Sequence, residues 1–160
     1  MNFLLHNEYG RKPNLKIEKG SYYCPDEESD MTPKYLRERL LNDLSKLDIP
    51  VDEFTFELRA YSRSFYGNYI PKGYRNREKA CIRIYPFRQV GEVYPYADLL
   101  ITAIHESCHH LQYRNPDYIR RRGIMHDAEF YKFLQEYVKK AVDLDIIREK
   151  NQNEIHKILE

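Results

Sequence analysis

The segment His105-Glu106-Ser107-Cys108-His109 combines two imidazoles and a carboxylate at a spacing that suits a metal ion. On a helix, residues four positions apart lie one turn apart on the same face, so both imidazoles could reach one Zn²⁺. Glu106 would point toward a water held by the metal and act as its general base. Zinc lowers the pKa of such a water to about 7, so hydroxide forms at neutral pH. We therefore expect Glu106 to be catalytic, and His105 and His109 to bind zinc.

A catalytic zinc site needs a third protein ligand and leaves a fourth position open. The sequence favours His126, because it precedes a predicted helix whose start an αα-hairpin would bring back toward the motif. Glu129 and Asp127 are the alternatives, since carboxylates also bind zinc. His110 lies about 100° around the helix from His109, so it cannot share the metal with the other two imidazoles.

Apolar residues at helical spacing predict helices on both sides of a small sheet. Thr32 is a good N-cap, and Pro33 suits the first turn of an N-terminal helix. The motif falls within a second helix, expected over residues 96–113. A third helix is expected from about 127 to 142, and the tail over 143–160 is expected to form a further short helix.

Three strands are expected between the first helix and the motif. Apolar and polar residues alternate from Phe54 to Tyr61, which is typical of a half-buried strand. Shorter extended segments follow over 65–70 and 80–85. Because short links join consecutive strands, we interpret the three as an antiparallel meander. The strand over 80–85 is expected to lie at the edge, where an extended substrate could pair with it.

Length and composition limit the class of protein. The chain has 160 residues, the usual size of one domain, of which 42% are hydrophobic and 32% charged. Lys+Arg 26 against Asp+Glu 25 leaves a net charge of +1, which excludes a histone-like polycation. No apolar run approaches the roughly 18 residues of a membrane helix, and three scattered cysteines argue against a disulfide scaffold. We expect a cytoplasmic protein that does not enter a membrane.

We interpret the whole as an α+β fold in three parts. An irregular N-terminal arm over 1–30 precedes the folded domain over 31–142, which contains the first helix, the small sheet and the two helices of the site. Residues 143–160 would add a C-terminal helical extension.

The two segments of the site together resemble a known family. The motif His105–His109, a basic loop and then the segment 126–130 are similar to the SprT-like zinc metallopeptidases, which include the Spartan proteases and are related to the WLM domains. The family pattern is H-E-x-x-H followed, after a variable loop, by H-G-x-x-F. Phe130 matches its aromatic residue, and Asp127 stands in place of its glycine.

The resemblance covers about residues 32–140, and the segments 66–69 and 82–86 are similar to the family's small sheet ahead of the active-site helix. It implies a zincin-like fold and a zinc ion held by the three histidines named above. It also implies hydrolysis of peptide bonds, with DNA-bound proteins as the best-known substrates of the family.

The sequence therefore predicts a zinc-dependent metalloendopeptidase acting on protein or peptide substrates, including nucleic-acid-associated proteins. The alternative is a non-catalytic, zinc-stabilised module that binds nucleic acid or protein, although a purely structural site has no use for the base Glu106.

Basic loops at 72–79 and 114–122 carry interleaved tyrosines and could bind nucleic acid weakly. Nothing in the sequence indicates the oligomeric state. The candidate donors to a substrate oxyanion are Tyr94, Tyr96, Tyr118 and Tyr131.

Overall fold

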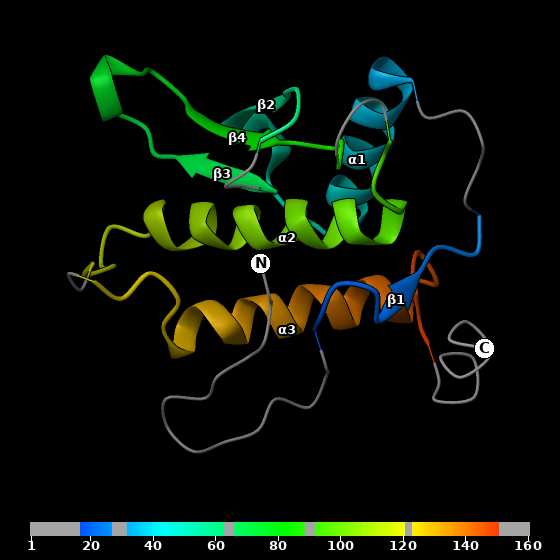
Figure 1. Cartoon of the computed structure of the whole chain (residues 1–160). Coiled ribbons are helices and arrows are strands. Elements are labelled where there is room, and N and C mark those ends of the chain that lie inside the picture. The colour runs from blue at the N-terminus through cyan, green and yellow to red at the C-terminus, as the bar shows by residue number, and fades with distance from the viewer. Residues whose placement is uncertain (1–16, 27–31, 63–65, 89–91, 121–122, 151–160) are drawn as a thin grey trace.

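Helix α2, Tyr96–Tyr113, forms the middle layer of the molecule, between a small sheet and helix α3, Ala128–Asp143 (Figure 1). The computed structural model describes residues 17–26, 32–62, 66–88, 92–120 and 123–150. The α+β class is as predicted, and both helices begin and end within one residue of their expected bounds. Across the described residues, no helix combines the length and the apolar character that crossing a membrane requires.

Three strands form the sheet on one side of α2: β2 (Phe54–Leu58), β3 (Gly67–Ile70) and β4 (Ala80–Ile84). Their order is β2-β4-β3, with β4 parallel to β2 and antiparallel to β3. The predicted antiparallel meander is therefore wrong, and so is the placing of the strand over 80–85 at an edge. A central position suits β4 because four of its five side chains are buried. These are Ala80, Cys81, Ile82 and Ile84.

Strand β3 is an edge strand of this sheet and packs directly on α2. A Cβ atom added to Gly67 would lie 2.9 Å from Cγ2 of Thr102 on α2 and 3.0 Å from the carbonyl oxygen of Arg83 on β4. The missing side chain therefore allows β3 to approach both neighbours closely. A loop that contains the 3-10 helix η2, Tyr74–Asn76, then joins β3 to β4.

Helix α1, Pro33–Lys46, begins after the predicted N-cap Thr32 and packs on α2 and β2. The 3-10 helix η1, Val51–Glu53, connects it to β2. The apolar residues that α1 buries are Leu36, Leu40 and Leu44. Their spacing of four residues is the helical period that predicted this element.

The two ends of the described chain meet in a second, two-stranded sheet. Strand β1, Tyr22–Tyr23, pairs antiparallel with β5, Arg148–Glu149. The prediction of a helix over 143–160 is wrong for its described part. After α3 the chain turns at Asp145, whose φ is 60°, and buries Ile147 before it enters β5. Residues 1–16 and 151–160, which complete the predicted arm and extension, lie outside the described residues.

Candidate metal centre

Helix α2 holds two of the candidate ligands in the interior of the protein. Seventeen of its residues, Tyr96 through Gln112, are buried, because the sheet covers one side of the helix and α3 the other. His105 and His109 are 5% and 7% exposed. Since they lie one helical turn apart, their rings are neighbours, with centroids 5.2 Å apart.

The third histidine is positioned by the start of α3. Asp127 is the N-cap of this helix, and its Oδ1 accepts a hydrogen bond of 2.9 Å from the backbone N–H of Phe130. The same oxygen accepts a hydrogen bond of 2.8 Å from Nε2 of Gln112, near the end of α2. Asp127 therefore ties the start of α3 to the end of α2, and this places His126 beside the motif.

The structure brings His105, His109 and His126 together. One ring nitrogen of each lies within 4.8 Å of the others, a geometry that could hold a metal ion. The centroid of the His126 ring is 4.9 Å from that of His105 and 5.1 Å from that of His109. Among the described residues the cluster includes neither Asp127 nor Glu129, and both carboxylates accept hydrogen bonds from Gln112.

Phe130 lies against all three imidazoles. Its ring centroid is 4.8 Å from that of His105, 4.6 Å from that of His109 and 4.7 Å from that of His126. The residue is fully buried in the first turn of α3. It therefore fixes the orientation of the three rings by packing and keeps solvent away from one side of the cluster.

Burial keeps the three imidazoles neutral. It lowers the pKa of His105 well below its usual value, and the nearby rings of His109 and His126 lower it further. Burial, followed by the charge of His126, lowers the pKa of His109 to about 3. The pKa of His126 is also lowered by burial. Neutral imidazole is the form that binds a metal, because its ring then offers a free lone pair.

Glu106 lies next to this cluster and is 5% exposed. Its Oε1 is 4.0 Å from Nε2 of His105, and its Oε2 is buried with no hydrogen-bond partner among the described residues. Burial raises the pKa of this carboxyl to about 8. A buried polar atom that lacks a protein partner usually bonds to a water or an ion, so this oxygen suits a site that contains one.

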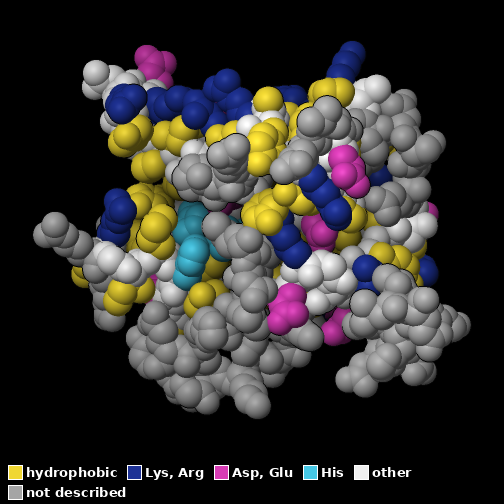
Figure 2. Space-filling view, viewed as in Figure 1, with side chains coloured by type: hydrophobic (Ala, Val, Ile, Leu, Met, Phe, Trp, Pro, Cys, Tyr) yellow, Lys and Arg dark blue, Asp and Glu magenta, His cyan; other side chains and the backbone are white. Residues whose placement is uncertain are grey.

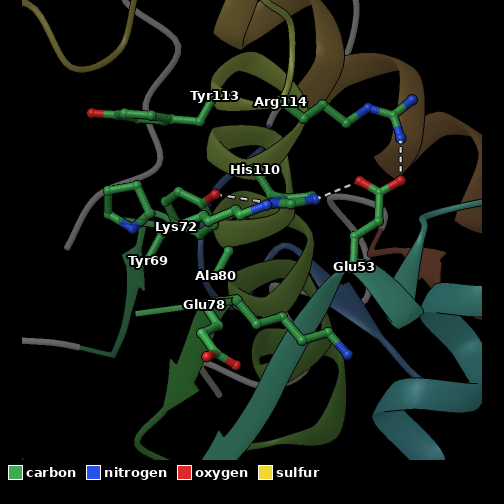
Figure 3. A pocket seen from close by; sticks show the side chains of 10 residues that line it. Glu53, Tyr69, Lys72, Glu78, Ala80, His110, Tyr113 and Arg114 are labelled. Carbon is green, nitrogen blue, oxygen red and sulfur yellow. Dashed lines mark hydrogen bonds and ion pairs between the residues drawn. The ribbon is translucent and has the colours of Figure 1, made fainter. Parts of the chain in front are cut away.

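His110 lies outside the cluster, about 100° around α2 from His109, as its position on the helix predicts. Its Nδ1 is 2.9 Å from the hydroxyl of Tyr69 on β3, and its Nε2 is 2.8 Å from Oε1 of Glu53 in η1 (Figure 3). Oε2 of Glu53 accepts a hydrogen bond of 2.9 Å from Arg114. Sequence reasoning missed this network, because its members come from three separate elements and follow no common spacing.

The four candidate oxyanion donors lie in different surroundings. Tyr96 is fully buried and donates its hydroxyl to Asp43, so it is not available to a substrate. The ring of Tyr131 is 6.2 Å from that of His126. The other two pack against tyrosines: Tyr94 against Tyr66, and Tyr118 against Tyr113.

Comparison of the chain with protein-family models, with curated proteins and with solved structures found no match. The site must therefore be interpreted from its own geometry and chemistry.

Proposed function

We propose that this chain is a zinc-dependent metallopeptidase of the SprT-like type, with a zincin-like fold. One observation carries the proposal: three imidazoles from two helices converge within 4.8 Å, and a buried carboxylate lies beside them. Burying three neutral imidazoles and a carboxyl oxygen that has no hydrogen-bond partner among the described residues is unfavourable for folding unless a bound group compensates. A metal ion with its water is a group of that kind.

The donor set suits zinc. Among the residues that the structure describes, it consists of three uncharged nitrogens and no oxygen ligand, whereas Mg²⁺ and Ca²⁺ prefer carboxylate and carbonyl oxygens. At a zinc–nitrogen distance of about 2.0–2.1 Å, tetrahedral ligands lie roughly 3.4 Å apart. The ring nitrogens lie within 4.8 Å of one another, so small rotations of the side chains would bring them to this separation.

The residues of the site would have separate roles in hydrolysis. His105, His109 and His126 would hold the ion, which supplies Lewis acidity and a water that is acidic at neutral pH. Glu106, whose Oε1 is 4.0 Å from Nε2 of His105, would take a proton from that water and pass it to the leaving amine. In the metal-free protein burial raises the pKa of this carboxyl to about 8, and the positive charge of a bound ion would favour its ionised form, which accepts a proton.

An extended peptide substrate would pair with β3 rather than with β4. Within the described residues β3 pairs with a strand on one side only, and its residue Tyr69 stacks on His109 with ring centroids 6.5 Å apart. A peptide added to this edge would therefore pass close to the three imidazoles. Figure 2 shows histidine side chains reaching the surface on this face of the molecule, at the level between β3 and α3 in Figure 1.

The test combines metal analysis with cleavage of an unfolded protein substrate. The purified chain should contain about one zinc ion, and Glu106→Gln should abolish cleavage while zinc content and fold persist. Glu129→Gln is the matched control, because this exposed carboxylate lies outside the cluster, and it should retain both zinc and activity. Absence of zinc, or undiminished cleavage by Glu106→Gln, would contradict the proposal.

The second candidate is a non-catalytic, zinc-stabilised module that binds nucleic acid. Figure 2 shows Lys and Arg side chains along the upper edge of the molecule, and the loop between β3 and β4 contributes the exposed residues Lys72, Arg75 and Lys79. Zinc without cleavage, together with oligonucleotide binding that weakens steeply as salt rises, would favour this candidate.

A further inference from the structure

A pocket of about 460 Å³ lies on the sheet side of α2, next to the metal centre (Figure 3). It forms where β2 and β4 begin, where β3 ends and where α2 approaches its last turn. His110 is part of its wall and is only 5% exposed. Since both ring nitrogens of His110 already have partners, in Tyr69 and Glu53, this part of the wall is rigid.

The pocket shares Tyr69 with the metal centre. The Tyr69 ring lines the pocket and stacks on His109, so the two sites are separated by one side chain. Pro71, two residues further along the chain, also lines the pocket. Pro71 directly follows β3, whose last residue is Ile70, so the pocket continues along this edge beyond the metal centre. A peptide that pairs with β3 beside the metal centre would therefore direct another of its side chains toward this pocket.

The charge at the mouth of the pocket is positive. Lys72 and Lys79 are exposed there and form no ion pair within the described part of the chain. The two carboxylate oxygens of Glu53 are occupied by His110 and Arg114. Apart from the Glu53–Arg114 pair, the charged residues that line the pocket are therefore two lysines and one glutamate, Glu78. The aromatic rings of Tyr69 and Tyr113 add apolar contact area beside these charges.

We propose that this pocket binds an acidic side chain, glutamate or aspartate, of an extended peptide substrate. The carboxylate of that side chain would lie between Lys72 and Lys79, and its methylene groups would contact the Tyr69 ring. That the ligand is a peptide rests on the proposed peptidase function. The preference for negative charge rests on the pocket alone.

The experiment measures peptide binding by fluorescence anisotropy with the zinc-loaded Glu106→Gln protein, which should not consume the peptide. Extended peptides would differ only in one residue, Glu, Gln or Lys, placed at successive positions. At the best position, the Glu peptide should bind about threefold to tenfold more tightly than the Gln peptide, as expected for one or two solvent-accessible ion pairs. This preference should weaken as salt is added.

Substitutions of Lys72 and Lys79 test whether these two residues cause the preference for the Glu peptide. Lys72→Gln combined with Lys79→Gln should abolish the preference, and Lys72→Glu combined with Lys79→Glu should reverse it in favour of the Lys peptide. The matched control removes two exposed positive charges outside the pocket, by Lys34→Gln and Lys132→Gln, and should retain the preference. A gain of binding to the Lys peptide cannot result from misfolding.

Equal binding of the Glu and Gln peptides at every position would overturn the proposal, as would a preference that survives in Lys72→Gln/Lys79→Gln. Cleavage of peptides by the zinc-loaded wild type, without any charge preference, would refute the pocket and leave the peptidase function intact. A lysine-dependent preference without any cleavage would support the pocket and refute the peptidase function.

Discussion

In the metal-free protein, Glu106→Gln should change how the free energy of unfolding depends on pH. Burial raises the pKa of Glu106 from 4.5 to about 8, so the folded protein keeps a proton that the unfolded chain releases between these values. The contribution of this proton to stability is complete below pH 4.5 and is lost as the pH rises through about 8. Glutamine does not titrate, so the free energy of unfolding of the variant should not fall in this way as the pH rises.

The magnitude follows from the size of the pKa shift. One pKa unit corresponds to about 1.36 kcal/mol. Raising the pH by two units, up to the folded pKa, therefore changes the free energy of unfolding by nearly twice that amount. Between about pH 6 and pH 8, the wild type should lose about 2 kcal/mol relative to Glu106→Gln, because the carboxyl is half titrated at the upper end. The measurement is urea denaturation with a chelator present, followed by circular dichroism at several pH values.

Comparing the two proteins cancels the groups that they share. Burial and the charge of His126 lower the pKa of His109 to about 3. This residue therefore makes both proteins less stable as the pH falls below 6.5. Burial lowers the pKa of Lys19 to about 7, so this residue changes the stability of both proteins above that pH. Parallel curves for the two proteins, or a wild type that gains stability relative to the variant as the pH rises, would refute the reasoning.

Four other substitutions test the site and its support. His126→Ala should lower the zinc content and remove the rise in melting temperature that zinc produces, whereas Asp127→Asn should keep the metal; the opposite pattern would show that the third ligand is misassigned. Phe130→Ala should destabilise the metal-free protein by about 3–5 kcal/mol, because it removes a fully buried ring; a loss below about 1 kcal/mol in urea denaturation would contradict this packing. Gly67→Ala should cost about 1–3 kcal/mol, since its Cβ would meet Thr102, and an unchanged melting temperature would show that β3 can move away from α2.

The helices were predictable because their signals are local. The cap at Thr32 and Pro33, and the apolar spacing within 96–113, lie inside the segments that they describe. The order of the strands depends on contacts between distant segments. Phe56 of β2 pairs with Ile82 of β4, although the whole of β3 lies between them in the sequence. No local pattern indicates this pairing. The assumption that consecutive strands are neighbours therefore gave the wrong topology.

The three histidines of the candidate site were predictable for the same reason. His105 and His109 are related by one helical turn, and His126 lies just before the N-cap of the next helix. The partners of His110 were not predictable, because Tyr69 and Glu53 are 41 and 57 residues away in the sequence. Only tertiary packing, of β3 on α2 and of η1 against α1 and β2, brings them together.

The burial of α2 has a consequence for how a metal would enter and leave. Backbone amides in a helix enclosed on both sides exchange with deuterium only when the whole fold opens, so the turns around His105 and His109 should be among the slowest to exchange. His126 precedes α3 and is only half-buried. The ion would therefore be captured and released from the side of His126, while α2 stays folded as the fixed half of the site.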